Sequence, residues 1–338
     1  VVVLTPRIYA QSPLREQDSG VTIYRFRFPS GNRPLNQVEG IPLVPMAIYM
    51  VSGFFTALSC IIREKPDVIH GNWIVPTGLI AALAGRITGV PVINTARGMD
   101  LRISERFPVR MLFDWAVKLS DEVNVVSASM KNRPSLKDAE VISSGVDDAF
   151  FAVTPNRTAQ RVLSTRSLEA VYDVRTLIES IPLVLERIPV ARFVIAGTGS
   201  QEQELKGRAA ELGIGHQVEF PGLVDTERIL GLMHESSVYV SCAVADGTSI
   251  ALMEAIAAGL IPVVTDIEPN RPLVSGGKDG FLFRPGDKHD LAQKIILALT
   301  EGVPPPVLDQ KRSDFNDMIR WSSVANRVIS SYNRLAVK

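Results

Sequence analysis

The stretch that decides the fold runs from Asp246 to Asp266 and reads DGTSIALMEAIAAGLIPVVTD. It opens with a short polar turn, rich in residues that favour turns and helix N-caps. An apolar helix is expected from Ile250 to Ala258, where Gly259 stops it. A helix N-terminus that is exposed carries unpaired N–H groups and a partial positive charge, so this turn predicts a seat for a phosphate or a sugar oxygen.

Two carboxylates, Asp246 and Glu254, lie eight residues apart across this turn and helix. Glu254 falls about one turn into the helix, where its carboxylate could accept hydrogen bonds from a pair of hydroxyls. The alternative is an ordinary strand-helix unit whose two carboxylates are merely solvated. This stretch resembles the E-x7-E region of GT-B glycosyltransferases, especially the retaining family 4 enzymes. The resemblance rests on an acid followed by glycine, on Glu-Ala eight residues after that acid, and on the following Ala-Gly-x-Pro-Val-Val-x-x-Asp.

Other segments resemble landmarks of the same family, in the order in which the family has them. They are the interdomain stretch at 141–147, the Gly-Arg turn at 164–166, the strand with its glycine turn at 193–199 and the strand end at 220–222. The resemblance implies an α/β fold of two Rossmann-like domains, each a doubly wound parallel sheet, facing a cleft (GT-B). It also implies a nucleotide-diphosphate sugar as the donor substrate, with no obligatory metal or other cofactor.

Length and composition agree with an enzyme of two domains. A chain of 338 residues exceeds what one core usually supports, and 46% apolar residues leave ample material to bury. Lysine plus arginine equals aspartate plus glutamate at 36 each, so bulk charge gives no argument for a nucleic-acid partner. Cys60 and Cys242 show no metal spacing and are expected to be reduced core residues of a cytoplasmic protein.

Strand and helix patterns alternate along the chain in two series, which predicts two domains. An acceptor-side domain is expected at 1–147, a nucleotide-sugar-binding domain at 148–315, and a closing helix at 316–338 that packs back on the first domain as in the resembling family. The link at 147–159 shows no periodicity. Strands are expected at 67–70, 90–95, 123–126, 140–142, 161–164, 193–196, 218–220, 238–241, 261–265 and 280–283, and helices at 77–88 and 109–119.

The opening residues 1–7, VVVLTPR, predict a buried strand. A GT-B domain normally opens with an earlier strand, a glycine-rich loop and a helix, so the chain is expected to begin at the second strand and to lack that loop. The alternative is that the first strand is replaced or trimmed. An unpaired edge at this strand would invite self-association.

Arg166 directly follows a predicted strand. In the resembling family this arginine neutralises the donor diphosphate, together with a lysine several residues later; a guanidinium suits phosphate because it binds bidentately and stays protonated. Tyr172 stands at the lysine position, where a phenol can donate one hydrogen bond. The alternative for Arg166 is a surface salt bridge. Gly197 and Gly199 resemble a phosphate-binding turn, although a single GxG is a weak signal.

The resemblance gives the two carboxylates different roles. Glu254 accepts from the ribose hydroxyls, and Asp246 lies near the donor sugar at the catalytic centre, one methylene shorter than the usual glutamate. In transfer with retention the departing phosphate takes the acceptor proton, while protein groups stabilise the transition state and the leaving diphosphate. The groups that hold sugar or phosphate are then the amides of Gly247, Thr248, Ser249 and Ile250.

The first domain is expected to bind the acceptor. His70, Asn72 and Trp73 follow one predicted strand end, and residues 97–100, RGMD, follow another. The latter resemble the family's His-Gly-x-Asp site. Arg97 replaces the histidine and cannot act as a base, so it is expected to anchor sugar oxygens or an anion. The alternatives are a packed strand terminus for His70 and Trp73, and a helix N-cap for Asp100.

Residues 40–62 carry no charge, which meets the length test for a membrane-spanning helix. Prolines and small polar residues interrupt the stretch, so a packed helix from about Met46 to Ile62 is expected instead. A basic rim beside such an apolar helix could touch anionic lipid, which would suit a lipid-linked acceptor. The rim residues are Arg7, Arg15, Arg25, Arg27 and Arg33.

The sequence therefore predicts a retaining, hexosyltransferase-type glycosyltransferase that moves a sugar from a nucleotide-diphosphate sugar to a sugar or lipid-linked acceptor, in cell-envelope polysaccharide or glycolipid synthesis. The expected location is the cytoplasm, peripheral at the inner face of the membrane. Two other functions stay open. One is a non-catalytic nucleotide-sugar-binding relative or a subunit completed by a partner, suggested by Tyr172, Arg97 and the first strand. The other is a GT-B epimerase that acts on the nucleotide sugar itself.

Overall fold

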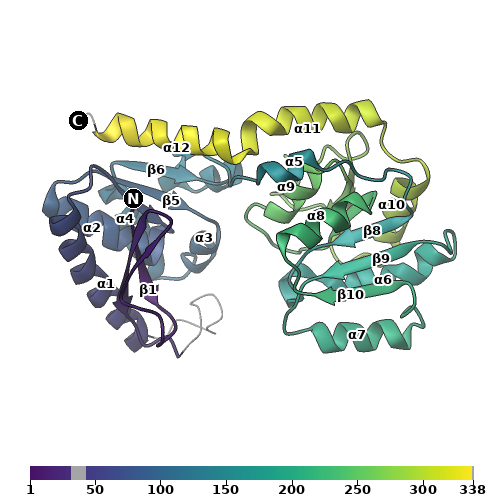
Figure 1. Cartoon of the computed structure of the whole chain (residues 1–338), viewed down its shortest axis with the longest axis horizontal. Coiled ribbons are helices and arrows are strands. Elements are labelled where there is room, and N and C mark those ends of the chain that lie inside the picture. The colour runs from purple at the N-terminus through teal and green to yellow at the C-terminus, as the bar shows by residue number, and fades with distance from the viewer. Residues whose placement is uncertain (32–42, 337–338) are drawn as a thin grey trace. The chain divides into compact units, whose positions relative to one another are not determined.

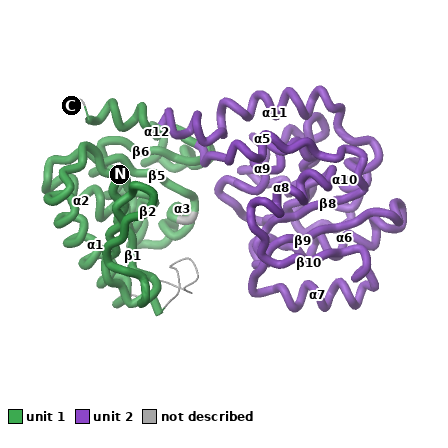
Figure 2. Tube along the Cα trace, viewed as in Figure 1, with its two compact units in different colours: residues 1–142, 328–338 green, residues 143–327 purple. Residues whose placement is uncertain are grey.

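The computed structural model describes residues 1–31 and 43–336. The chain divides into two compact units, residues 1–142 with 328–338 (unit 1) and residues 143–327 (unit 2), which Figure 2 colours separately. Arg33 and residues 40–42 of the uncharged stretch lie outside the described residues.

Unit 2 is built on six strands with helices packed against them (Figure 1). The strands are β8 (Arg161–Ser164), β9 (Arg192–Ala196), β10 (Val218–Gly222), β11 (Val238–Ser241), β12 (Ile261–Thr265) and β13 (Phe281–Phe283). The helices are α5 (Asp148–Ala152), α6 (Val174–Leu185), α7 (Glu202–Glu211), α8 (Thr226–His234), α9 (Ile250–Ala257), α10 (Lys288–Thr300), α11 (Pro305–Ile319) and α12 (Trp321–Ala336), which begins in unit 2 and ends in unit 1.

The sheet of unit 2 is parallel throughout, in the order β10-β9-β8-β11-β12-β13. Successive residues of a strand point to opposite faces. Val162 and Val238 accordingly pack with α6 and α10 on one face. Leu163 and Tyr239 pack with α8 and α9 on the other. The predicted doubly wound parallel sheet is confirmed, and its winding direction changes between β8 and β11.

Two segments of unit 2 differ from the sequence-based prediction. The link at 147–159 contains the short helix α5, because Asp147 caps it by accepting from the Ala149 N–H at 2.8 Å. The expected closing helix is present as α12, but it begins at Trp321, and a further helix, α11, precedes it, separated from it by an extended residue, Arg320. Beside this break, the Val146 N–H donates to the Ile319 carbonyl at 2.7 Å.

Unit 1 has more irregular strand pairing. Its strands are β1 (Val2–Arg7), β2 (Arg15–Asp18), β3 (Val21–Arg27), β4 (Ile69–Asn72), β5 (Val92–Ala96), β6 (Glu122–Val125) and β7 (Glu140–Val141). Its helices are α1 (Leu43–Glu64), α2 (Leu79–Thr88), α3 (Met99–Ile103) and α4 (Val109–Leu119), with short helical turns at Ile74–Gly78, Ala128–Asn132 and Pro134–Leu136.

Strands β4 to β7 form a parallel sheet, as predicted, and the four strands lie in chain order. The first of them is displaced from its predicted range. Residue Ile69 pairs with Val92 and Asn72 pairs with Thr95, so the strand runs two residues beyond His70. His70 and Asn72 therefore lie within β4, and the prediction that they follow the strand end was wrong.

The remaining three strands form a separate sheet in the order β1-β3-β2, in which β1 is parallel to β3 and β2 is antiparallel. The hairpin between β2 and β3 turns at Ser19 and Gly20, both with positive φ, which is the geometry of a tight two-residue hairpin loop. The prediction that β1 is a buried strand was wrong. It lies at the edge of the sheet, and Val1, Val2 and Val3 are 93%, 39% and 40% exposed.

The expected packed helix in the uncharged stretch is confirmed as α1. Tyr49, Ala57 and Ile61 are buried against Phe26 of β3, and Phe26 and Tyr49 stack edge to face with ring centroids 4.9 Å apart. Residues Val44–Glu64 are nonetheless long and apolar enough to cross a bilayer by length and composition alone. That test is also met by the core helix of a soluble protein, and α1 packs into unit 1 along one side.

Candidate functional site

Arg166 and Asp246 meet beyond the carboxyl ends of β8 and β11. These strands are neighbours at the point where the sheet reverses its winding, which is where ligands of such sheets bind. The Arg166 guanidinium donates from Nη2 to Asp246 Oδ2 at 2.6 Å and from Nη1 to Ser249 Oγ at 2.8 Å. Both side chains of the ion pair are largely buried, at 9% and 15% exposure, so the arginine is not in a surface salt bridge.

Tyr172 supports this arginine from one side. Its ring centroid lies 4.1 Å from the Arg166 Cζ, so the guanidinium stacks on the aromatic face. The stacked guanidinium is held at two donors by Asp246 and Ser249, while its buried Nε has no hydrogen-bond partner among the described residues. A buried N–H group of this kind is suited to an anionic ligand.

Glu254 lies on α9, in the turn after Ser249 caps the helix. Burial raises the pKa of the Glu254 carboxyl to about 7, and Arg166 opposes the shift by favouring the charged form. A carboxyl in such surroundings gains from hydroxyl donors, which compensate for lost hydration. Its chemistry matches the predicted role as an acceptor for ribose hydroxyls.

The polar turn before α9 is more occupied than the sequence suggested. The Gly247 N–H donates to its neighbour Asp246 at 2.9 Å, and Ser249 Oγ accepts from the Leu252 N–H at 3.2 Å as the N-cap. The Gly247 amide, one of the predicted donors, thus has a partner within the protein, whereas at Ser249 it is the hydroxyl oxygen that is engaged. The turn also contains Thr248, and the side chain of Ile250 is 45% exposed.

Gly197 and Gly199 allow two backbone segments to approach each other closely. A Cβ at Gly197 would collide with the carbonyl of Arg166, and a Cβ at Gly199 would collide with the carbonyl of Leu168. The Leu168 N–H donates to the Thr198 carbonyl at 3.0 Å. In this geometry the glycine turn after β9 supports the loop that carries Arg166.

Tyr239 and Thr165 also lie close to these groups and were not among the predicted site residues. Tyr239 is fully buried on β11; burial raises the pKa of its phenol to about 12, while the charges of Glu254 and Asp246 add to the shift and Arg166 and Thr165 oppose it. Neither hydroxyl has a partner of good hydrogen-bond geometry among the described residues. A tyrosine within an otherwise apolar buried strand was the only available signal, because buried phenols usually need a partner.

In unit 1, His70 has partners at both ring nitrogens. Nδ1 lies 2.6 Å from Tyr332 Oη, and Nε2 lies 2.7 Å from Thr95 Oγ1. Burial, together with the charge of Arg97, lowers the pKa of the imidazole to about 4. This neutral histidine has the surroundings of a packed residue of the strand, which is the alternative to an acceptor contact that the sequence left open.

Asp100 is also engaged by the protein. Its carboxylate is 1% exposed and accepts from the N–H groups of Ile74, Gly98, Arg97 and Leu101 at 2.9 to 3.2 Å. Burial raises the pKa of this carboxyl, and the backbone donors oppose that shift. Asp100 thus holds two loops together, while Gly98 occupies the N-cap of α3.

Beside these buried groups, Arg97 and Asn72 form an exposed pair. The Arg97 guanidinium donates from Nη2 to Asn72 Oδ1 at 2.8 Å. Trp73, the next residue, has a φ of 72°, a conformation that non-glycine residues rarely adopt. Of the five residues predicted for the acceptor, these three retain groups that can reach a ligand.

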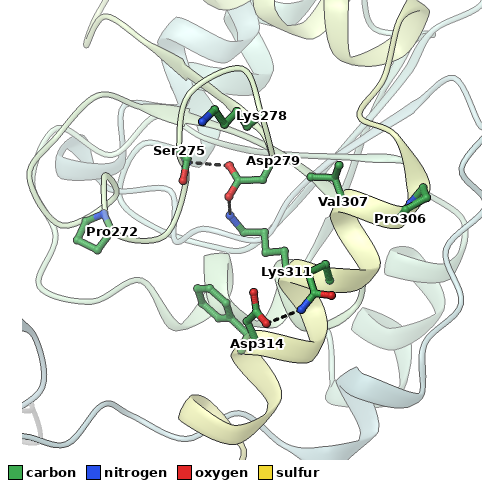
Figure 3. Close-up of a pocket in the computed structure, with 10 residues that line it drawn as sticks. Pro272, Ser275, Lys278, Asp279, Pro306, Val307, Lys311 and Asp314 are labelled. Atoms are coloured by element: carbon green, nitrogen blue, oxygen red, sulfur yellow. Dashed lines mark hydrogen bonds and ion pairs between the residues drawn. The ribbon is translucent and has the colours of Figure 1, made fainter.

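A separate hollow of about 430 Å³ lies in unit 2, between α11 and the segment after β12 (Figure 3). Lys311 Nζ is 2.6 Å from Asp279 Oδ2 and also donates to the Leu273 carbonyl, and Asp279 Oδ1 accepts from the Ser275 N–H at 2.7 Å. Burial lowers the pKa of the Lys311 ammonium, while Asp279 opposes that shift. The hollow shares no residue with the predicted site and is lined by Pro272, Ser275, Lys278, Asp279, Pro306, Val307, Gln310, Lys311, Asp314 and Phe315.

Metal ligands do not gather at either place. Within 1–31 and 43–336, no three histidine, cysteine, aspartate or glutamate side chains are placed so that they could hold a metal ion together.

Known proteins match the chain over most of its length. Residues 146–317 match the family described as glycosyl transferases group 1, and residues 1–134 match the glycosyl transferase 4-like domain. A glycogen synthase of Mycobacterium tuberculosis is 26% identical over 79% of this chain and 69% of its own. The UDP-Gal:alpha-D-GlcNAc-diphosphoundecaprenol alpha-1,3-galactosyltransferase of Escherichia coli is 25% identical over 71% of this chain and 68% of its own.

Among solved structures, a sucrose-phosphate synthase from Thermosynechococcus elongatus superimposes with a TM-score of 0.77 at 16% identity, over 99% of this chain and 88% of that one. The likeness concerns the fold, which is the GT-B arrangement of two Rossmann-like units expected from the sequence. Since the family match alone spans half of the chain, the protein belongs to the glycosyl transferases group 1 family and is a GT-B glycosyltransferase.

Proposed function

We propose that the protein transfers a hexose from a nucleotide-diphosphate sugar to a sugar or lipid-linked acceptor with retention of the anomeric configuration. The observation that carries the proposal is the buried guanidinium of Arg166, which Asp246 and Ser249 hold where the unit 2 sheet reverses its winding, between β8 and β11. Glu254 lies on α9, the helix that Ser249 caps. A nucleotide-sugar donor is also consistent with the E. coli relative, whose name specifies UDP-galactose.

In this proposal the donor is held by unit 2. Arg166 binds the diphosphate through its remaining N–H groups, since Asp246 and Ser249 fix the orientation of the fork. Asp246 lies beside the donor sugar, and Glu254 accepts from the ribose hydroxyls. Amides of residues 247–250 that the protein does not already use complete the contacts to sugar and phosphate.

The acceptor is held by unit 1. Arg97 and Asn72 offer donors and an acceptor to sugar hydroxyls, and Trp73 offers an apolar face on which a sugar ring can stack. Asp100 positions Arg97 by accepting from its N–H group, and His70 contributes to the packing of the strand, because its ring nitrogens are engaged by Tyr332 and Thr95.

The bond between the anomeric carbon and the diphosphate oxygen breaks as the acceptor oxygen attacks from the same face. The acceptor proton passes to the departing phosphate oxygen, which balances the reaction without a protein base. Arg166 contributes mainly by stabilising the negative charge that develops on the leaving diphosphate. We place the reaction in the cytoplasm at the inner face of the membrane, in cell-envelope polysaccharide or glycolipid synthesis.

The test is product analysis. UDP-, GDP- and ADP-sugars are first ranked by their effect on the thermal midpoint, and the best is then incubated with simple glycosides and lipid-linked sugars. We expect a glycoside whose anomeric configuration matches the donor by NMR. Nucleotide-sugar binding without any product would support a non-catalytic relative, and a nucleotide sugar with an inverted ring carbon would support an epimerase.

The raised pKa of Glu254 predicts a pH-dependent affinity. Ribose hydroxyls donate to the ionised carboxylate, so binding of UDP should tighten about tenfold between pH 6 and pH 8, as a group with a pKa near 7 ionises. The measurement is calorimetry at several pH values. The phosphate of UDP titrates in the same pH range, so Glu254→Gln is the control. This variant should remove the part of the pH dependence of UDP affinity that comes from the protein. A pH dependence equal to that of wild type would contradict the role of Glu254.

The same shift has a consequence for stability, with a definite sign. The folded-state pKa of Glu254, about 7, lies above its unfolded value of 4.5, so the folded state holds the proton more tightly. The tighter proton binding of the folded state stabilises it fully below pH 4.5, and this contribution to the free energy of unfolding is lost as the pH rises through about 7. Glu254→Gln should therefore raise the thermal midpoint more at pH 8 than at pH 5.

A further inference from the structure

We propose that unit 1 carries a docking surface for an anionic lipid bilayer, formed by Phe107, Met111 and Trp115 with Arg106, Arg110 and Lys118 (the α4 face). The inference goes beyond sugar transfer, since none of these residues belongs to the site described above.

The α4 face contains three large apolar side chains that are exposed. Met111 and Trp115 are four residues apart on α4, the spacing that brings side chains above one another on a helix. Phe107 lies in the turn before α4, where the Arg110 N–H donates to the Arg106 carbonyl at 3.0 Å. Phe107, Met111 and Trp115 are 81%, 57% and 52% exposed. The other side of α4 is fully buried at Phe113 and Ala116. The helix therefore has two apolar sides, and the core covers only one.

The charges beside these residues are positive. Arg106, Arg110 and Lys118 are exposed, and within the described part of the chain none of them lies within ion-pair distance of a carboxylate. Asp114, on the same helix, is neutralised by Arg133 Nη2 at 3.1 Å. Glu105 is the one exposed acid in the adjoining turn. Because the whole chain carries no net charge, this excess of cations is local.

The surface extends at its far end onto α2. Arg86 Nε donates to the Leu119 carbonyl at 3.3 Å, which holds another cation beside the end of α4. Ile87, the next residue, is 65% exposed. The basic and apolar character is thus supplied by two helices whose positions in unit 1 are fixed by packing.

An anionic bilayer fits this combination best. Apolar and tryptophan side chains enter the boundary between headgroups and acyl chains, while exposed lysine and arginine side chains attract anionic headgroups. The exposed stripe of α1 makes a useful contrast. It presents Val51 at 58% and Phe55 at 65% exposure, but residues 43–62 contain no charge, and Arg25 of the predicted basic rim is paired with Glu16 at 2.6 Å.

The experiment is co-sedimentation of the full chain with vesicles of phosphatidylcholine, with and without phosphatidylglycerol. Binding is expected only with phosphatidylglycerol and should weaken with salt. Arg110→Gln with Lys118→Gln should reduce it about thirtyfold, and Met111→Gln with Trp115→Gln about tenfold. The matched control is Val190→Gln with Leu223→Gln, which alters exposed apolar residues of unit 2 and should bind like wild type. Unchanged circular dichroism shows that each variant folds.

Trp115 also provides a direct readout. Brominated phosphatidylglycerol should quench the wild-type fluorescence, and Trp115→Phe should remove that quenching while binding persists. Three results would each overturn the proposal: no vesicle binding, equal binding to neutral vesicles, or a loss caused by Val51→Gln with Phe55→Gln but not by the α4 variants. A change of oligomeric state in the α4 variants without any effect on lipid binding would instead identify the face as a contact between copies.

Discussion

Arg166→Gln is expected to weaken the binding of UDP by roughly 30- to 100-fold, since hydrogen bonds to charged groups contribute about 1.5 to 3 kcal/mol each. The substitution removes the guanidinium that contacts Asp246 and Ser249. It also leaves the buried Asp246 carboxylate without its counter-ion, 2.6 Å away in the wild type. Arg166→Lys should be little better, because a point charge cannot contact Asp246, Ser249 and a phosphate in one plane.

The decisive comparison is UDP against uridine. If Arg166 binds the diphosphate, the variant should lose most of the preference for UDP while its affinity for uridine changes by less than about threefold. Arg161→Gln is the matched control, since Arg161 is at the opposite end of β8 and pairs with Glu219 and Glu235 instead. An Arg166 variant that prefers UDP as strongly as wild type would assign the diphosphate to another cation.

Lys311→Ala is expected to lower the free energy of unfolding of unit 2 by about 3 to 5 kcal/mol, the usual result of removing one partner from a buried ion pair. Lys311 and Asp279, which form an ion pair (Figure 3), are only 7% and 16% exposed. The ammonium also donates to the Leu273 carbonyl. The substitution thus leaves the Asp279 carboxylate and the Leu273 carbonyl without this partner. It also removes the contacts by which Lys311 of α11 holds the segment after β12.

Chemical unfolding followed by the fluorescence of unit 2 measures this loss. Lys206→Ala is the matched control: its ion pair with Glu202 has a similar 2.7 Å separation but is 40% and 24% exposed, so less than about 1 kcal/mol is expected. Lys311→Met combined with Asp279→Asn should recover part of the stability, because the amide oxygen introduced at position 279 would still accept from the Ser275 N–H. A loss below about 1 kcal/mol in Lys311→Ala would mean that the pair is solvated.

The place of the residues that we propose for the donor site could be predicted because Arg166 and Asp246 follow strands. Hydrophobic runs located β8, β11 and β12 correctly, and parallel strands present their carboxyl ends at one edge of a sheet. That reasoning placed Arg166 and Asp246 at the same edge. It could not show that they touch, because the contact depends on β8 and β11 being neighbours, and strand order is set by crossover connections that leave no local trace.

The details that could not be predicted depend on packing. The phenol hydroxyl of Tyr172 was expected to be available as a hydrogen-bond donor, but that the ring stacks on the Arg166 guanidinium depends on the path of a loop and could not be predicted. The strand expected at 67–70 was taken to end at His70, whereas the register with β5 carries it to Asn72. The hairpin strand β2 reads REQD, a polar sequence without the period of a strand, and it forms through the turn at Ser19 and Gly20.

The close approach at Gly197 and Gly199 affects how mutational scans of this protein should be interpreted. Any side chain at these positions pushes against the carbonyls of Arg166 and Leu168, so it displaces the guanidinium from a distance. In a selection for activity, both glycines would score like ligand contacts although the contact they make is with another part of the backbone. A scan that ranks positions by lost activity would consequently assign too many residues after β9 to the proposed nucleotide site.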